Sequence, residues 1–347
     1  MKPETLLIRA DASPLIGAGH VMRCLALAQA WRKEGRQAHF VGRVDSDALR
    51  QRIQEAGCGF IALGEVSLAV DLPETLTCFR RLEASWLVLD GYPFDSAYQL
   101  GLKQAGVRVL VVDDYHHLAQ YHADMVLNQN IGAEAFDYGL GPQGRTLAGC
   151  RYVLLRPEFS NVRLDDMRAK GAHLRLLVTL GGADPENVTA IVLDALALLQ
   201  PRDFQVRVVV GPANPHVDRL RRQAEGLGDF VEIVLGADMP LEMQWADFAI
   251  TAAGSTCWEL MFMGVPLACL VLADNQAGIA QGLQAAQAAV SLGRAEGHDA
   301  RSLAESLVPF LADPEKRHRL SLRARGMVDG RGASRVVACM LGRNDEL

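Results

Sequence analysis

The sequence predicts an α/β protein made of two successive Rossmann-like domains. Short apolar runs alternate with longer stretches of helical periodicity, and this alternation starts twice along the 347 residues. Each series begins with a strand, a glycine-containing loop and a helix, which is how a βαβ unit opens. Half of the residues are hydrophobic, which is enough to fill two ordinary cores.

The first series predicts an N-terminal domain over residues 1–165. Its apolar runs are short, rich in Val, Leu and Ile, and end in a polar residue, as buried parallel strands do. Strands are expected over residues 6–8, 38–41, 86–89, 107–112 and 125–127, and helices over residues 21–33 and 47–56. A charged stretch over residues 161–172 interrupts the pattern and is expected to link the domains.

The second series predicts a C-terminal domain over residues 172–325, followed by a C-terminal helix within residues 330–347. Strands are expected over residues 174–180, 205–210, 230–235, 248–251 and 266–272, and helices over residues 188–199, 256–263 and 277–288. The pattern after residue 301 is helical. Ligands of open α/β sheets bind outside the carboxyl ends of the strands, so two such domains facing each other predict a site in the cleft between them.

Composition excludes several classes of protein. The 35 basic and 41 acidic residues give a net charge of -6, which argues against a large nucleic-acid-binding surface. The seven cysteines are scattered and form no C-x-x-C pair, which predicts reduced thiols in a cytoplasmic protein. No stretch approaches about 18 apolar residues, and the N-terminus has no long apolar segment, so neither a membrane span nor a signal peptide is expected.

The loop between the first strand and the first helix contains Gly17, Gly19 and His20. Glycines let the backbone approach a ligand closely, and the start of a helix favours an anion. The loop is not the dinucleotide fingerprint, because Met22 occupies the position of the third glycine. His20 at the start of the helix can serve as a general base near neutral pH, or simply hydrogen-bond locally.

The corresponding loop of the second domain contains Gly181 and Gly182. These glycines can line a phosphate group, although the following Asp184-Pro185 pair is also an ordinary signal for the start of a helix.

A further strand-to-helix turn contains Gly254 and Ser255, which can hold a diphosphate. Glu259, one turn into the helix, can accept hydrogen bonds from a ribose diol. The spacing of Thr256 and Glu259 also fits a capping box, which is the more ordinary explanation.

Other polar residues follow predicted strands. Asn275 and Gln276 suit sugar hydroxyls and amides, or cap a helix. Asp11, Asp90 and Asp113 each end a strand of the first domain, and Tyr92 follows one of them; turn and cap roles are the usual explanation for single aspartates. Three histidines (His116, His117 and His122) lack the i, i+4 spacing of two metal ligands on one helix face, so no metal site is expected.

These motifs, in this order, resemble a known enzyme family. Arg9–Ser13 and Ile16–Ala28 resemble the N-terminal signature of UDP-2,4-diacetamido-2,4,6-trideoxy-β-L-altropyranose hydrolases, which act in pseudaminic acid biosynthesis. Later segments of the chain agree with the same family: Leu89–Tyr92, Val112–Asp114, Leu127–Asn130, Leu180–Asp184 and Asn275–Gln276. The second half, over residues 238–266, is similar to the GT-B glycosyltransferase that adds N-acetylglucosamine to a peptidoglycan lipid precursor.

The resemblance implies a GT-B fold, with UDP held by the second domain and the sugar facing the first. It implies a C-terminal helix that packs back on the first domain, and a role in flagellin glycosylation or surface polysaccharides. The substrate-binding residues that it implies are Asp11, Gly17, Gly19, Tyr92, Asn130, Gly181, Gly182, Met239, Gly254, Ser255, Glu259, Asn275 and Gln276.

The implied reaction is hydrolysis of the anomeric C–O bond with inversion. In the family a histidine matching His20 is the base for the attacking water, and helix N-termini and backbone N–H groups stabilise the departing UDP. No metal or other cofactor is expected, and the candidate loops contain no D-x-D motif. Two alternatives are a glycosyltransferase that passes the sugar to an acceptor, and a nucleotide-sugar sensor without catalysis.

Overall fold

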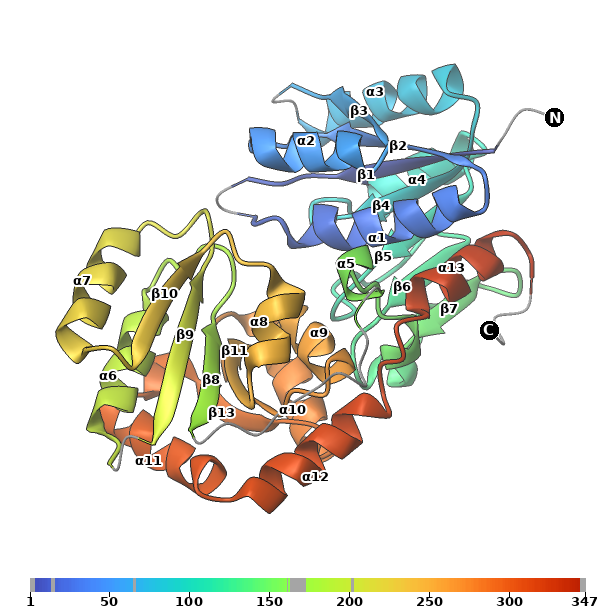
Figure 1. The fold of residues 1–347 in the computed structure, drawn as a ribbon. Coiled ribbons are helices and arrows are strands. Elements are labelled where there is room, and N and C mark those ends of the chain that lie inside the picture. Colours follow the sequence, from blue (N-terminus) through green and yellow to red (C-terminus); the bar gives the residue numbers. More distant parts are fainter. Residues whose placement is uncertain are drawn as a thin grey trace. The chain divides into compact units, whose positions relative to one another are not determined.

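The computed structural model describes residues 4–13, 16–64, 67–160, 162, 173–200 and 203–343. It divides the chain into two compact units, Met1–Ser160 with Gly330–Leu347 (unit 1) and Asn161–Asp329 (unit 2). Each unit is a parallel sheet with helices on both faces (Figure 1). The linker predicted over residues 161–172 lies outside the described residues, apart from residue 162.

Unit 1 is built on a seven-stranded parallel sheet. Its strands are β1 (Thr5–Ala10), β2 (Gln37–Gly42), β3 (Gly59–Ala62), β4 (Ala84–Asp90), β5 (Val109–Val112), β6 (Met125–Asn128) and β7 (Arg145–Ala148). Its helices are α1 (Gly19–Lys33), α2 (Asp47–Glu55), α3 (Leu68–Arg81), α4 (Ser96–Gln104), η1 (Ala133–Ala135), η2 (Cys150–Tyr152), α5 (Pro157–Ser160) and α13 (Gly332–Met340). The strand order is β3-β2-β1-β4-β5-β6-β7.

Unit 2 is built on a six-stranded parallel sheet. Its strands are β8 (Leu174–Thr179), β9 (Phe204–Val210), β10 (Val231–Leu235), β11 (Phe248–Ala252), β12 (Leu267–Val271) and β13 (Val290–Arg294). Its helices are α6 (Val188–Leu198), α7 (Val217–Leu227), α8 (Met239–Trp245), α9 (Thr256–Phe262), η4 (Asp274–Gln276), α10 (Ala277–Ala285), η5 (Ala295–Gly297), α11 (Ala300–Leu311) and α12 (Pro314–Arg325). The strand order is β10-β9-β8-β11-β12-β13.

The strand order reverses at one point in each sheet. In unit 1 this point lies between β1 and β4, whose residues pair in parallel up to Ala10 and Asp90. In unit 2 it lies between β8 and β11, which pair up to Thr179 and Thr251. Ligands of open α/β sheets bind at the carboxyl ends of the strands on either side of such a reversal. The topology therefore selects two loops in each unit as candidate binding loops.

Both faces of the unit 1 sheet are covered by apolar side chains. One face packs against α1, α2 and α13 through buried residues that include Trp31 and Trp86, and the other against α3 and α4. Helix α13 is fixed to this unit, since the Trp86 indole N–H donates to the Met340 carbonyl at 3.0 Å. A Cβ at Gly332 would lie 2.2 Å from the Val153 carbonyl oxygen, so only glycine allows this close approach.

Small differences from the predicted elements have local causes. Strand β5 begins at Val109 rather than at residue 107, because the Val107 N–H bonds to the Leu102 carbonyl in the turn that ends α4. All seven cysteines are free, as their scattered spacing predicts, and all are buried. Within the described ranges, no helix is both long enough and apolar enough to cross a lipid bilayer.

Candidate active site

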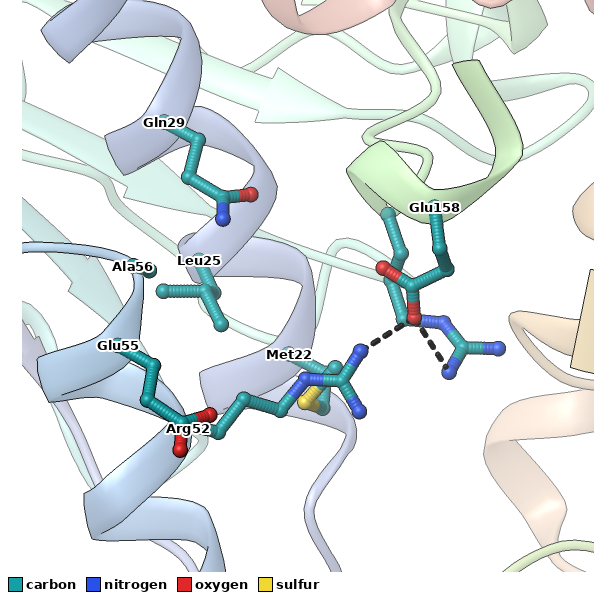
Figure 2. A pocket seen from close by; sticks show the side chains of 8 residues that line it. Met22, Leu25, Gln29, Arg52, Glu55, Ala56 and Glu158 are labelled. Carbon is teal, nitrogen blue, oxygen red and sulfur yellow. Dashed lines mark hydrogen bonds and ion pairs between the residues drawn. The ribbon is translucent and has the colours of Figure 1, made fainter. Parts of the chain in front are cut away.

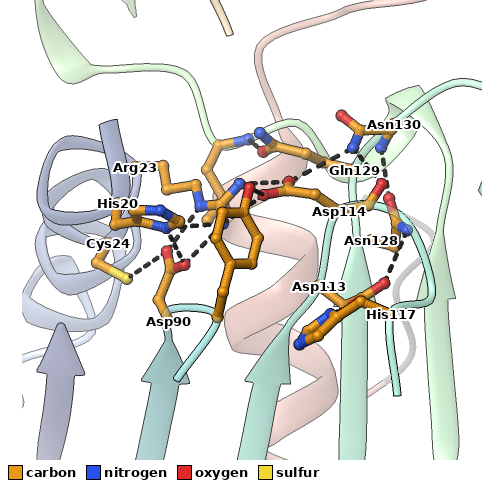
Figure 3. Close-up of polar contacts among 12 residues, drawn as sticks. His20, Arg23, Cys24, Asp90, Asp113, Asp114, His117, Asn128, Gln129 and Asn130 are labelled. Atoms are coloured by element: carbon orange, nitrogen blue, oxygen red, sulfur yellow. Dashed lines mark hydrogen bonds and ion pairs between the residues drawn. The ribbon is translucent and has the colours of Figure 1, made fainter. Parts of the chain in front are cut away.

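The first candidate site lies where β1 and β4 end, at the reversal of strand order in unit 1. His20 is the second residue of α1, and Asp90 is the last residue of β4. The His20 Nδ1 and Asp90 Oδ1 atoms are 2.6 Å apart (Figure 3). The Asp90 side chain is completely buried, so this contact is shielded from water. A histidine at the start of α1 is thus tied to the end of β4.

The charge on Asp90 fixes the tautomer of His20. Burial alone would raise the pKa of Asp90, but the charge of Arg23, the interaction with His20 and the hydrogen bonds from both hold it well below its ordinary value. Asp90 is therefore a carboxylate that can only accept hydrogen bonds. The proton of neutral His20 accordingly sits on Nδ1, and Nε2 presents the lone pair that a general base requires.

Arg23 connects this pair to a second carboxylate. Its Nε and Nη2 atoms donate to the two oxygens of Asp90, both at 2.6 Å. Its Nη1 atom donates to Asp114 Oδ1, also at 2.6 Å. Burial alone would lower the pKa of Arg23, but the two carboxylates raise it well above its ordinary value. The guanidinium is a permanent charge that holds both aspartates in place.

Tyr92 and Asn130 join the same network through Asp114. The Tyr92 hydroxyl donates to Asp114 Oδ2 at 2.9 Å, and the Asn130 amide donates to the Asp114 backbone carbonyl at 2.8 Å. The Tyr92 ring meets the His20 ring edge-on, with centroids 5.2 Å apart. The structure therefore brings three residues of the sequence hypothesis, His20, Tyr92 and Asn130, into one cluster.

Arg23 and Asp114 are the residues that sequence reasoning did not assign to the site. Both stand inside motifs that were recognised, but neither was given a role. His20 and Arg23 are three residues apart on α1, so they share one face of the helix. That spacing is the signal by which Arg23 could have been found.

Asp11 has other partners. Its carboxylate accepts hydrogen bonds from the Arg9 guanidinium, one of them at 3.0 Å, and from the Arg43 backbone N–H at 2.7 Å. Arg9 in turn pairs with the buried Asp71 at 2.6 Å. These bonds tie the loop after β1 to the end of β2 and to α3. This is the cap and turn role that is usual for a single aspartate.

Gly17 and Gly19 shape the loop that leads to His20. Gly17 has a φ of 78° and its N–H bonds to the Ser13 carbonyl at 2.8 Å, which closes a turn that glycine adopts without strain. Gly19 is the first residue of α1 and has open space around its Cα. The loop therefore leaves room beside the start of the helix.

Unit 2 places its predicted residues at the carboxyl ends of β8, β11 and β12. Gly181 and Gly182 follow β8 with open space around them. Gly254 and Ser255 lie between β11 and α9, Ser255 is exposed, and Glu259 is buried within α9. The capping box predicted for Thr256 and Glu259 is wrong, because Ser255 is the N-cap and makes no side-chain cap bond. Thr256 is the first residue of α9 and not its N-cap, so its side chain does not form the capping box with Glu259.

Two other residues of this unit have visible local roles, Asp184 and Gln276. Asp184 accepts hydrogen bonds from the Val188 and Thr189 N–H groups, at 2.8 and 3.0 Å, and so caps α6 as an ordinary helix-start aspartate would. The Gln276 amide oxygen accepts the Leu272 N–H at 2.9 Å, which fixes the turn after β12. Asn275 directly precedes Gln276 in η4. Met239 is the first residue of α8, and it is half-buried.

A separate hollow of about 230 Å³ lies in unit 1 beside α1 and α2 (Figure 2). Arg52 and Arg156 both pair with Glu158 at its edge. The residues that line it are Met22, Leu25, Gln29, Arg52, Glu55, Ala56, Arg156 and Glu158. None of them belongs to the predicted site.

Comparison with known proteins agrees with this architecture. Residues 175–325 match the model of the glycosyltransferase family 28 C-terminal domain. The chain is 15% identical to Acinetobacter baumannii MurG, with a TM-score of 0.69 over 98% of this chain and 100% of that one. A UDP-GlcNAc 2-epimerase from Neisseria meningitidis gives a TM-score of 0.70 at 12% identity, over 98% of this chain and 100% of that one. The chain has the GT-B fold.

Curated relatives cover both units. The uncharacterized protein MJ1062 of Methanocaldococcus jannaschii is 28% identical over 78% of this chain, and the match spans only 56% of that relative's length. The spore coat polysaccharide biosynthesis protein SpsG of Bacillus subtilis is 28% identical over 68% of this chain and 70% of that protein. The UDP-2,4-diacetamido-2,4,6-trideoxy-β-L-altropyranose hydrolase of Campylobacter jejuni is 26% identical over 63% of this chain and 74% of that protein.

Proposed function

We propose that this protein hydrolyses a UDP-linked 2,4-diacetamido-2,4,6-trideoxy hexose to UDP and the free sugar, with inversion at the anomeric carbon. The observation that carries the proposal is the His20–Asp90 pair, a histidine whose Nδ1 is held by a buried carboxylate at 2.6 Å. The similarity to the Campylobacter jejuni hydrolase supports the choice of substrate.

His20 is the proposed base. Its Nε2 takes a proton from water as the water oxygen attacks the anomeric carbon, and the bond from that carbon to the diphosphate oxygen breaks. UDP leaves as an anion and needs no acid to protonate it. The carboxylate of Asp90 stabilises the imidazolium that forms, because Asp90 and Asp114 together outweigh the single positive charge of Arg23.

Unit 2 carries the proposed nucleotide site. Glu259 is assigned to the ribose hydroxyls, and the diphosphate to the turns that contain Gly181, Gly182, Gly254 and Ser255. The open space around these glycines supports the assignment, since backbone N–H groups can then reach a phosphate oxygen. We expect turnover to persist in excess EDTA, because charge on the leaving group is met by these backbone groups rather than by a metal.

Replacement of the base tests the proposal. His20→Ala and His20→Phe should lower kcat by at least about 10³-fold, the effect of losing a general base, while UDP binding measured by calorimetry stays nearly unchanged. His318→Ala is the matched control, because His318 is exposed on α12 in unit 2. Full activity of His20→Ala would remove the base assignment and with it this mechanism.

A glycosyltransferase is the second candidate function. The match of residues 175–325 to a glycosyltransferase domain favours it. The two functions differ in what receives the sugar, so rapid release of UDP with no acceptor present rejects the transferase. Release of UDP only after an acceptor is added would reject the hydrolase instead.

A further inference from the structure

We propose that His117 is a second sugar-binding histidine, whose Nε2 accepts a hydrogen bond from an acylamino N–H of the sugar. This inference rests on the proposed function, because it concerns the sugar that the function names. From the sequence, His117 is expected to be a loop histidine without a metal. The inference gives it a contact that determines which sugar binds.

The first observation is a second His–Asp pair at the same sheet edge. Asp113 directly follows β5, the strand beside β4, and His117 Nδ1 lies 2.8 Å from its Oδ1 (Figure 3). Asp113 also accepts bonds from the Tyr121 and Tyr138 hydroxyls, both at 2.9 Å, and from the His116 backbone N–H at 2.7 Å. With the Asn128 amide, which donates at 3.3 Å, five donors converge on one buried carboxylate.

These donors keep Asp113 ionised. Burial alone would raise the pKa of Asp113, but the bond from His117, followed by those from the His116 N–H and the two tyrosines, lowers it below its ordinary value. A carboxylate accepts and does not donate, so the proton of neutral His117 sits on Nδ1. Nε2 is consequently an acceptor.

The second observation is that this acceptor is unused. Among the described residues, His117 Nε2 is buried and has no hydrogen-bond partner. Leaving a buried polar group unpaired costs about 1–3 kcal/mol, so such groups are few in native structures. The cluster around Asp113 orients His117 with several hydrogen bonds and leaves its other nitrogen unsatisfied, which is the arrangement expected of a group that awaits a ligand.

The third observation identifies the kind of ligand. The Tyr92 ring lies 5.7 Å from the His117 ring and 5.2 Å from the His20 ring, so one tyrosine contacts both histidines. The Tyr115 ring lies 5.3 Å from His117, and Tyr92 and Tyr115 are 37% and 42% exposed. An acceptor beside two exposed aromatic rings suits a group that combines an N–H donor with a methyl, and an acetamido group has both.

Access of a ligand to Nε2 requires a movement of the aromatic side chains that pack on His117. Tyr115 is exposed, and exposed side chains change rotamer in picoseconds to nanoseconds. Since Tyr115 is not among the donors to Asp113, we expect a change of its rotamer to open a path to Nε2 while those hydrogen bonds are kept.

Two variants distinguish loss of the proposed acceptor, His117 Nε2, from loss of the hydrogen bond between His117 Nδ1 and Asp113. His117→Asn keeps an N–H donor for Asp113 and deletes Nε2, whereas His117→Gln can return an acceptor near that position. With the UDP-diacetamido sugar, His117→Asn should raise KM about tenfold, the effect of one neutral hydrogen bond, with kcat within about twofold. His117→Gln should recover most of the loss, and His122→Asn, a loop histidine whose backbone N–H bonds to Gln99, should behave as the wild type.

The nature of the sugar group is tested with a UDP-6-deoxyhexose that lacks acylamino groups. Its KM should be the same for the wild type and His117→Asn. An unchanged KM for the diacetamido substrate in His117→Asn would overturn the inference. An equal loss with both substrates would also overturn it, because the effect would then not depend on the acylamino group.

Binding of the free sugar separates this inference from the proposed function. In the whole protein labelled with ¹⁵N-histidine, the His117 Nε2 resonance is assigned by its absence in His117→Asn. It should shift when 2,4-diacetamido-2,4,6-trideoxy hexose is added and stay in place when UDP is added. A shift in a protein that releases no UDP would reject the hydrolase and keep the sugar contact; no shift up to the highest sugar concentration rejects the contact.

Discussion

Replacing Asp90 by Asn perturbs the proposed base without touching it. Asn keeps the size of the side chain and removes the charge that fixes the His20 tautomer. Arg23 Nη2 lies 3.2 Å from His20 Nδ1, so once the carboxylate is gone this N–H can donate to Nδ1. The imidazole proton then moves to Nε2, and the lone pair that should receive the proton of water is lost.

The size of the effect follows from the distance between the charges. With Nδ1 and Oδ1 2.6 Å apart, the centres of the two charges are separated by about 4 Å. At an effective dielectric constant of about 20 this pair is worth about 4 kcal/mol, which corresponds to about 10³-fold in kcat. Loss of the correct tautomer acts in the same direction, so about 10³-fold is the smallest loss that we expect.

The assay is the initial rate of UDP release, followed with a coupled enzyme at saturating substrate. UDP affinity and the melting temperature are measured on the same preparation, so that unfolding is not mistaken for lost catalysis. Asp124→Asn is the matched control, since Asp124 pairs with Lys103 in unit 1 away from His20. A kcat for Asp90→Asn within tenfold of the wild type, in a folded protein, would refute the role assigned to the His20–Asp90 pair.

Two further predictions concern nucleotide binding and acid stability. Glu259→Gln should weaken UDP binding about tenfold in calorimetry, because a ribose hydroxyl then donates to a neutral oxygen; an unchanged affinity would contradict the ribose assignment. The pKa values of Asp71, Asp90 and Asp113 are lower in the folded chain than ordinarily, so their stabilisation is present above the ordinary aspartate pKa of about 3.9 and is lost as the pH falls below it. Urea unfolding should therefore give a clearly smaller free energy of unfolding at pH 3 than at pH 6, and Asp113→Asn should reduce the difference; equal values at both pH would contradict it.

The central strands of both sheets and the edge strand β10 could be predicted from sequence, whereas the edge strands β3, β7 and β13 could not. Strands such as β1 and β11 are buried along their whole length and are apolar over most of it. The edge strands β3, β7 and β13 each expose part of their length and mix polar or glycine residues with apolar ones. Their sequences carry no such run, so they were absent from the predicted set.

The candidate site could be predicted in part from the loops that follow predicted strands. His20 and Tyr92 were candidates from such loops, whereas Asn130 came only from the family resemblance; the strand order then brings all three together. Partners across the network were harder to identify, because Arg23 and Asp114 meet only after β1, β4 and β5 pair. The role of His117 depends on donors to Asp113 that are spread over residues 116–138, which no local sequence pattern reveals.

The most direct test of the central claim follows oxygen from water into product. The protein is incubated with UDP-2,4-diacetamido-2,4,6-trideoxy hexose in H₂¹⁸O without any acceptor, and the products are examined at once by NMR and mass spectrometry. Attack at the anomeric carbon predicts ¹⁸O in the sugar, none in UDP, and a first-formed anomer inverted relative to the substrate. Label in the diphosphate, or no release of UDP until an acceptor is added, would contradict the account.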